Sequence, residues 1–219
     1  MPENIVIAID GTSASGKSTN SRLIAKKLEF IYVDTGAMYR TLAWYCLKKD
    51  VDIHDGRKVA SVVRRWKFKF ICEDGQVKLL VDGYYPEKEI RTAETSAAVP
   101  HVAAVPSVRK WMKEKQRECI GFGNLVMEGR DIGSNVFPET NYKFYLDASL
   151  AERQRRRDAD GVTENLAARD QRDSQRKAAP LMIPLGAIVI DNNGETPEET
   201  SNRIIGEVTR LRKENEPTA

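Results

Sequence analysis

Near its amino terminus the chain reads Ile5-Val-Ile-Ala-Ile-Asp-Gly-Thr-Ser-Ala-Ser-Gly-Lys-Ser18, and this segment indicates the class of fold. Its first part, Ile5–Ile9, is a continuous apolar run rich in β-branched residues, which suits a strand buried on both faces of a parallel sheet. The run breaks at Asp10-Gly11, and a helix is expected to start at Lys17. A strand, a glycine-containing loop and a helix in this order are typical of α/β folds.

The loop itself fits the pattern G-x-x-x-x-G-K-[ST] of a phosphate-binding P-loop. Its glycines let successive backbone N–H groups converge on phosphate oxygens, and the helix N-terminus adds partial positive charge. Lys17 is expected to reach the β- and γ-phosphates, and Ser18 to ligate Mg²⁺. The alternative is a Gly/Ser-rich turn with an ordinary surface lysine, which the strand–loop–helix setting disfavours. The residues predicted to bind the nucleotide here are Gly11, Thr12, Ser13, Ala14, Ser15, Gly16, Lys17, Ser18 and Thr19.

Similar short apolar runs recur along the chain, with helical stretches between them. The stretch 37–48, for example, carries Met38, Leu42 and Cys46 at four-residue spacing. Strands that alternate with helices predict an α/β fold with a doubly wound, five-stranded parallel sheet of the P-loop NTPase type. The four further strands are expected at 30–33, 125–127, 142–146 and 187–190.

One stretch departs from this alternation. The apolar runs 67–72 and 77–81 are separated by Glu73-Asp-Gly-Gln76, and an Asp-Gly turn between short strands predicts a small antiparallel β insertion. The expected domains are 1–61 with 106–219 as the P-loop core, 62–105 as an inserted subdomain, and 150–177 as a helical lid within the core.

Several helix starts are also readable. Ser149-Leu-Ala-Glu152 and Thr196-Pro-Glu-Glu199 both match the capping box, and Pro106 is expected to open a further helix.

Composition excludes several classes of protein. The chain has 219 residues, of which 35 are basic and 32 acidic, and the net charge of +3 is too near neutral for a dedicated nucleic-acid binder. Three cysteines far apart and two histidines support neither a disulfide framework nor a zinc site. No apolar run approaches the roughly 18 residues of a membrane span. We expect a cytoplasmic monomer that binds small molecules, with no nucleic acid and no membrane as a partner.

The second strand is followed by Asp34-Thr-Gly-Ala-Met-Tyr-Arg40. It lies at the carboxyl edge of the predicted sheet, where ligands bind in doubly wound folds. Thr35 and Arg40 could hold an anion there, and Asp34 could help to position Mg²⁺ or its waters. The alternative for Arg40 is an ordinary solvated helix residue.

The third parallel strand is followed by Glu128-Gly-Arg-Asp-Ile-Gly133. A guanidinium beside a carboxylate offers a bidentate phosphate fork and a polar reader of a base or ribose, so Arg130 and Asp131 are candidates for both tasks. The alternative is a local surface pair of these two residues.

The lid stretch, Leu150 to Lys177, holds eight basic and six acidic residues. Arg169, Asp173 and Arg176 are spaced i, i+4, i+7 and are expected to share one helical face. Two helical arms with a break at Asp160-Gly161 are what a closing lid requires, because closure brings arginines over the phosphates and expels water. The alternative is a solvated helix pair. Arg156 and Arg157 are predicted to reach the nucleotide, although spacing leaves the choice among them and Arg153 open.

A P-loop does not by itself name the reaction. The N-K-x-D signature of GTPases is absent from the sequence, and the third strand ends in Glu128 rather than the aspartate of a motor ATPase. A kinase that joins two phosphorylated molecules would explain the many arginines, because transfer depends on alignment and charge stabilisation. The alternatives are another P-loop small-molecule kinase, for adenylate, thymidylate or shikimate, and a non-catalytic nucleotide- or RNA-binding protein.

Taken together, these motifs resemble the bacterial cytidylate kinases, the (d)CMP kinase family. The resemblance covers nearly the whole chain, and the ordered set of motifs is more specific than any one of them. The matching segments are Ile7–Ser18, Asp34–Arg40, Ile90–Thr92, Gly129–Gly133, Val136–Pro138, Arg169–Asp173, Ala179–Leu181 and Ala187–Asp191.

The resemblance implies that ATP with Mg²⁺ phosphorylates CMP and dCMP, and that the 62–105 insertion is the nucleoside-monophosphate-binding subdomain of the family. By matching position, the acceptor phosphate would be held by Thr35, Arg40 and Arg130, the cytosine faced by Arg109, Asp131 and Arg176, and the sugar region faced by Arg169 and Asp173. The residues expected to act directly in catalysis are Lys17, Arg40 and Arg130. The chain departs from the family pattern at Pro100, where members commonly carry a serine, and at Glu128, where aspartate is usual. The preference between CMP and dCMP therefore stays open.

Overall fold

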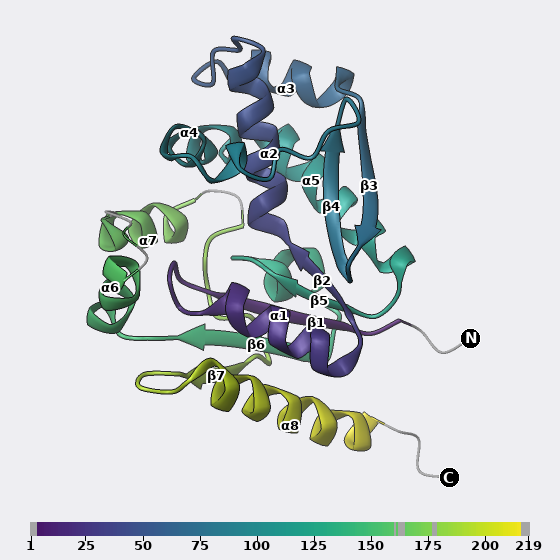
Figure 1. Cartoon of the computed structure of the whole chain (residues 1–219), viewed down its shortest axis with the longest axis vertical. Helices are drawn as coiled ribbons and strands as arrows, with labels where there is room; N and C mark the ends of the chain where they lie inside the picture. Colours follow the sequence, from purple (N-terminus) through teal and green to yellow (C-terminus); the bar gives the residue numbers. More distant parts are fainter. Residues whose placement is uncertain (1–3, 160, 162–164, 177–178, 216–219) are drawn as a thin grey trace. The chain divides into compact units, whose positions relative to one another are not determined.

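The computed structural model describes residues 4–159, 161, 165–176 and 179–215 (Figure 1). The chain divides into two compact units. Unit 1 comprises Met1–Tyr32 and Gly123–Ala219, and unit 2 comprises Val33–Phe122.

The strand that leads into the P-loop lies at the centre of the sheet of unit 1. This strand, β1 (Val6–Gly11), pairs in parallel with β5 (Leu125–Glu128) on one side and β6 (Tyr142–Asp147) on the other. β6 pairs in parallel with β7 (Ile188–Asp191), and β2 (Ile31–Asp34), whose first two residues belong to unit 1, is the neighbour of β5. All six residues of β1 are buried, as its apolar sequence predicts.

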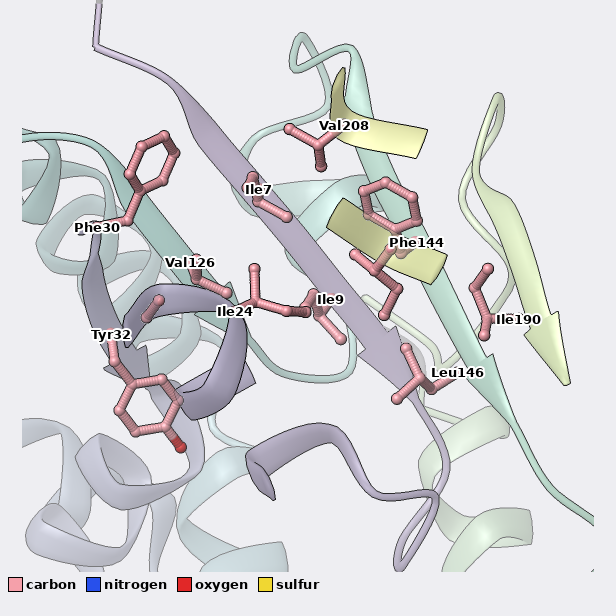
Figure 2. Close-up of a cluster of buried hydrophobic side chains, with 12 residues drawn as sticks. Ile7, Ile9, Ile24, Phe30, Tyr32, Val126, Phe144, Leu146, Ile190 and Val208 are labelled. Carbon is pink, nitrogen blue, oxygen red and sulfur yellow. The ribbon is translucent and has the colours of Figure 1, made fainter. Parts of the chain in front are cut away.

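Two helices cover the core of unit 1. α1 (Lys17–Leu28) packs against α8 (Pro197–Asn215), and Figure 2 shows the buried cluster of side chains that α1, α8 and the strands contribute. The predicted capping box at the start of α8 is confirmed, because Thr196 N–H donates to Glu199 Oε2 at 2.8 Å and Glu199 N–H donates to Thr196 Oγ1 at 3.2 Å.

The lid stretch forms two short helices, α6 (Leu150–Ala159) and α7 (Leu166–Ser174). Ser149 Oγ caps α6 by accepting from Glu152 N–H at 3.2 Å, and Asn165 Oδ1 caps α7 by accepting from Ala168 N–H at 3.0 Å. The expected break is at Asp160-Gly161; Asp160 lies outside the described residues, and Gly161 lies in a turn with a positive φ of 67°.

Unit 2 contains the antiparallel insertion. β3 (Phe68–Glu73) and β4 (Gln76–Val81) pair in antiparallel fashion, and the turn residues Asp74 and Gly75 both have positive φ (51° and 69°), as a two-residue type I′ turn requires. β4 is in turn the neighbour of β2. The rest of unit 2 is helical: α2 (Thr35–Lys48), α3 (Gly56–Arg65), η1 (Glu89–Arg91), α4 (Ala93–Ala103), α5 (Pro106–Glu118) and η2 (Cys119–Phe122).

The α/β fold class with a mostly parallel sheet is thus confirmed, and one detail is corrected. Counted over both units, the described residues form seven strands rather than five. The difference arises because the predicted antiparallel β insertion is not separate from the parallel sheet. Its strand β4 hydrogen-bonds with β2, so β3 and β4 add two strands to the sheet in the order β3-β4-β2.

Candidate active site

The backbone of the P-loop favours glycine at two positions. Gly11 has φ +150°, and a Cβ placed on it would lie 2.3 Å from the carbonyl oxygen of Leu146. Gly16 has φ +88° and forms the N-cap of α1. Among the described residues no side chain caps this helix, so the first N–H groups of α1 keep their capacity to bind an anion.

Lys17 is held inside this loop. Its side chain is buried, and its Nζ donates to the carbonyl oxygen of Thr12 at 2.5 Å and to Ser15 Oγ at 3.4 Å. Burial lowers the pKa of Lys17 well below its usual value, and the nearby charges of Arg130 and Arg169 lower it further. Burial and like charge therefore both disfavour the protonated form of Lys17 at this place.

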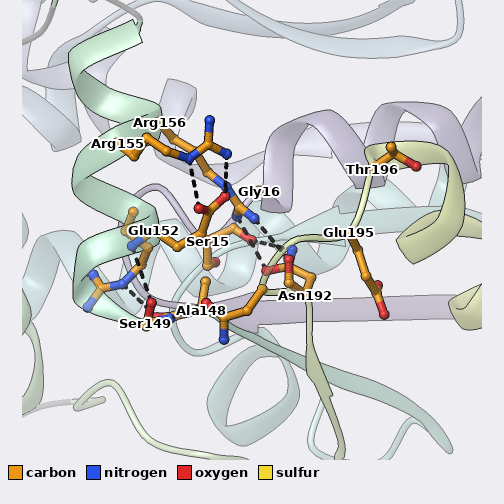
Figure 3. A network of polar contacts seen from close by, with 12 residues as sticks. Ser15, Gly16, Ala148, Ser149, Glu152, Arg155, Arg156, Asn192, Glu195 and Thr196 are labelled. Carbon is orange, nitrogen blue, oxygen red and sulfur yellow. Dashed lines mark hydrogen bonds and ion pairs between the residues drawn. The ribbon is translucent and has the colours of Figure 1, made fainter.

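A residue far along the chain forms a hydrogen bond to the backbone of the loop. Asn192 is buried, and its Nδ2 donates to the carbonyl oxygen of Ser15 at 2.9 Å. Arg156 in turn donates to the Asn192 carbonyl at 3.0 Å and is paired with Glu152 at 2.8 Å; Figure 3 shows this network. The predicted contact of Arg156 with ATP stays a prediction; here its partners are protein groups.

Two further arginines of α6, Arg153 and Arg157, reach the P-loop directly. Arg153 is buried and donates to the carbonyl oxygens of Ala148 at 3.0 Å and Ser13 at 3.2 Å, and to Asp170 Oδ2 of α7 at 2.6 Å. It therefore ties both lid helices to the loop. Arg157 Nη2 donates to Ser13 Oγ at 3.1 Å, which places this guanidinium beside the loop that is predicted to carry the phosphates.

A second network joins the Gly129–Gly133 motif to the lid. Arg130 donates through Nη1 to the carbonyl oxygen of Gly11 at 3.0 Å and through Nε to Asp173 Oδ2 at 2.9 Å, while Arg176 pairs with the other oxygen of Asp173. Burial alone would raise the pKa of Asp173, but the charges of Arg130 and Arg176 hold it below its usual value. Asp173 thus stays ionised and orients two guanidinium groups.

The prediction that three residues of this region share one helical face was wrong. The spacing placed Arg169, Asp173 and Arg176 on a single helical face, but α7 ends at Ser174. The helix stops because Gln175 leaves the helical conformation as its C-cap, with its N–H bonded to the carbonyl oxygen of Gln171. Arg176 nevertheless meets Asp173, as the ion pair shows.

Asp131 lies at the start of an unusual turn. It is buried, and it precedes η3 (Ile132–Val136), a π-helical turn of the kind that is common at functional sites. Its Oδ2 accepts from Asn135 Nδ2 at 2.9 Å, so the carboxylate is held by its own turn.

Unit 2 carries the remaining predicted residues. Asp34 Oδ1 caps α2 by accepting from Ala37 N–H at 2.7 Å, and Asp34 Oδ2 accepts from Arg40 Nη2 at 3.0 Å. Thr35, the first residue of α2, is buried. Arg109 is buried on α5, with its guanidinium carbon 5.9 Å from the centre of the Tyr39 ring.

The residues present are compatible with Mg²⁺. Ser18 and Thr19 are exposed on the first turn of α1, so the Ser18 hydroxyl is accessible to an ion. Asp34 would have to share a carboxylate that already accepts two hydrogen bonds. Within the described ranges no group of three or more His, Cys, Asp or Glu residues could hold a metal by itself.

Sequence reasoning missed three residues of this region. Asn192 carries no local signal, because its partner Ser15 is 177 positions away. Glu128, the last residue of β5, is buried and accepts from Tyr32 Oη at 2.5 Å. Asp10 is completely buried near the end of β1; the sequence shows it only as the residue at which the apolar run of the strand breaks.

The parallel strands, the glycine-built loop and the enclosed lysine define a P-loop protein that binds phosphate groups. The family model for cytidylate kinase matches residues 7–210 of the chain. The chain is 39% identical over 216 residues to the cytidylate kinase of Clostridioides difficile (strain 630), with 94% of this chain and 98% of that protein covered. It is 40% identical over 211 residues to the cytidylate kinase of Caldanaerobacter subterraneus subsp. tengcongensis, with 91% and 92% covered.

A longer relative carries the same region. The bifunctional pantoate ligase/cytidylate kinase of Prochlorococcus marinus (strain MIT 9312) is 37% identical over 218 residues, which are 94% of this chain and 43% of that protein. The chain belongs to the cytidylate kinase family, and it is a P-loop nucleoside monophosphate kinase.

Proposed function

We propose that this protein transfers the γ-phosphoryl group of ATP to CMP and dCMP, giving CDP and dCDP. One structural observation carries the chemistry: the buried Lys17 ammonium lies inside the P-loop, and Arg130 and Arg157 donate to residues of the same loop. Such a cluster is electrostatically unfavourable until an anion enters it. Two phosphorylated substrates that react with each other bring that anion.

The transfer itself needs no general base. A phosphate monoester has its second pKa near 6, so the acceptor phosphate of CMP is already an anionic nucleophile at neutral pH. One of its oxygens attacks the γ-phosphorus, the bond from that phosphorus to the β–γ bridging oxygen breaks, and the electron pair leaves with ADP. The protein contributes alignment and stabilisation of the charge that spreads over the equatorial oxygens.

The donor would bind along the P-loop. The N–H groups of Gly11–Thr19 would hold its phosphates, with Lys17 on the β- and γ-phosphates. Mg²⁺, when bound, would neutralise charge on these phosphates, with Ser18 and Asp34 as its protein ligands. Arg156 and Arg157 would complete the site from the lid. Arg157 supports this role because it is already within hydrogen-bond distance of the loop, at Ser13 Oγ.

The acceptor would be read by fixed pairs of arginine and carboxylate. Its phosphate would be held by Thr35, Arg40 and Arg130, its base by Arg109, Asp131 and Arg176, and its sugar region by Arg169 and Asp173. Cytosine offers an exocyclic amine that needs an acceptor, and O2 and N3 that need donors. Buried groups arranged for that pattern are left unpaired by uracil, so UMP should be a poorer substrate.

A substrate panel tests this proposal. With ATP and Mg²⁺, ADP formation is measured for CMP, dCMP, UMP, AMP, dTMP and shikimate by a coupled assay. We expect kcat/KM for CMP or dCMP to exceed that for UMP by roughly 10²-fold or more. Selective turnover of AMP or shikimate would reject the proposal in favour of another P-loop kinase. RNA binding that falls steeply with salt, without any consumption of ATP, would favour a binding protein instead.

Two further expectations remain predictions. None of the helices described for this chain is long and apolar enough to cross a membrane. The cytoplasmic location and the monomeric state expected from the sequence are not decided by that finding.

A further inference from the structure

Asp10 is a completely buried carboxylate that neither the donor site nor the acceptor site described above includes. It is the penultimate residue of β1. Its Oδ1 accepts from Ile132 N–H at 2.8 Å, and its Oδ2 accepts from Gly133 N–H at 2.7 Å. Both oxygens therefore bind the first turn of η3.

This turn follows directly after Arg130 and Asp131. The side chain of Arg130 donates to the carbonyl oxygen of Gly11, the residue next to Asp10. The carbonyl oxygen of Asp131 accepts from Asn135 N–H at 2.9 Å and from Val136 N–H at 3.1 Å, so the backbone of Asp131 is bonded to the turn. Asp10 thus binds the turn that follows Asp131, and Gly11 binds the side chain of Arg130.

An ionised carboxylate buried at this place destabilises the folded state. Burial raises the pKa of Asp10 from 3.8 to about 7, in spite of the two backbone hydrogen bonds that favour the ionised form. The ionised form offers a strong acceptor to each N–H; the hydroxyl oxygen of a neutral carboxylic acid is a weaker acceptor, and an amide places a donor opposite one of the two donors. Packing alone would be satisfied by an apolar residue of similar size, because an unpaired buried charge is unfavourable.

We propose that Asp10 is a positioning residue, which in its ionised form fixes the Arg130–Asp131 pair in the orientation that reads the cytidine acceptor. The proposal rests on the proposed function. Other charged groups also face Asp10: Asp131, which opposes its ionisation, and Lys17, which favours it. Glu128 ends the neighbouring strand, in register with Ile9. Loss of the Asp10 charge should therefore disturb acceptor recognition while the backbone amides of the P-loop stay in place.

The direct test replaces Asp10 by asparagine, which keeps the size and one acceptor. In Asp10→Asn, we expect kcat/KM for CMP to fall by roughly 10²-fold, comparable to the loss of an oriented charged donor. The preference for CMP over UMP should shrink, and the Kd of a non-hydrolysable ATP analogue should change by less than about threefold, since its amide ligands are untouched. The matched control is Asp147→Asn, at the exposed end of the neighbouring strand β6.

The second test uses the wild-type protein and so does not depend on whether the variant folds. Between pH 8 and pH 6, kcat/KM for CMP should fall as Asp10 takes up a proton, with a midpoint near 7. The substrate phosphate also titrates in this range. Dividing the wild-type kcat/KM at each pH by the fraction of dianionic CMP, obtained from a titration of CMP alone, removes that contribution, and the corrected value should still decline toward acid.

Each outcome decides the proposal. A selective loss of CMP use and discrimination, together with an acid decline in the corrected wild-type profile, supports it. Equal damage to CMP use and ATP-analogue binding, unchanged kinetics, or a corrected wild-type profile that stays level from pH 8 to pH 6 overturns it. A wild-type protein that does not turn over CMP refutes the proposed function, and the role of Asp10 with it; wild-type turnover with an indifferent Asp10→Asn refutes only the latter.

Discussion

Replacing Lys17 by alanine is expected to reduce kcat for CMP phosphorylation by about 10³-fold or more, equivalent to about 4 kcal/mol of transition-state stabilisation. The physical reason is its place in the P-loop: the ammonium group is buried and held by Thr12 and Ser15, where an incoming phosphate chain would replace these contacts. No other lysine in the described part of the sequence lies in this loop. Steady-state kinetics with CMP and ATP measures the effect.

The fold should survive this substitution. Lys17 is a buried cation whose pKa is lowered first by burial and then by Arg130, so the alanine variant loses a group that the folded state disfavours. Because the folded pKa lies below the unfolded one, the unfolded state binds more protons in the window between them, and wild-type stability should rise with pH there. Lys17→Ala should lack this rise, as thermal unfolding at several pH values can show. Lys26→Ala, an exposed lysine on the same helix, is the control.

Near-wild-type turnover by Lys17→Ala would refute the donor-site assignment. If Lys17→Ala loses both its activity and its folded state, Lys17→Met becomes the test of the donor-site assignment. Methionine retains the length of the side chain without its charge. Folded Lys17→Met with normal turnover would have the same refuting force.

Replacing Arg130 by alanine should damage the use of CMP far more than the binding of ATP. Arg130 follows β5 and is fixed by Gly11 and Asp173, and the proposed acceptor phosphate would take the place of part of this bonding. We expect kcat/KM for CMP to fall by roughly 10²–10³-fold, the effect of removing one oriented donor from a transferring group. The Kd of a non-hydrolysable ATP analogue, measured by calorimetry, should change little.

Two further variants sharpen this prediction. Arg130→Lys keeps the charge but not the fork, so it should recover only part of the loss if bidentate geometry matters. Arg210→Ala removes an exposed arginine that pairs with Glu207 and Glu214 on α8, and it should behave like wild type. Equal losses in CMP use and in ATP-analogue binding by Arg130→Ala would contradict an acceptor-side role.

The elements that could be predicted from the sequence are those with a local cause. β1 is apolar throughout because both its faces are buried, the Asp74-Gly75 turn supplies two positive φ angles, and the Thr196–Glu199 box closes on itself. The strand number could not be predicted in the same way. Whether a hairpin joins a sheet depends on pairing with a strand that is remote in sequence, and no periodicity within the hairpin records it.

The candidate site follows the same division. The P-loop and the Arg130–Asp131 motif were recognisable because their residues are contiguous. The partners that hold them are not: Asp173 meets Arg130 across 43 positions, and Asn192 meets Ser15 across 177. Local spacing even misled, since α7 ends before Arg176, although the ion pair with Asp173 still forms.

The cluster of cations around Lys17 has a consequence for handling the protein. Any multivalent anion that enters the loop relieves their repulsion and binds only the folded state, so it raises the melting temperature according to its concentration and Kd. Phosphate or sulfate in a purification buffer would therefore mask part of the stabilisation that a nucleotide provides, and would compete with it for the loop. Thermal-shift screens of ligands should use chloride or acetate buffers, because the reference melting temperature is then that of the protein without a multivalent anion in the loop.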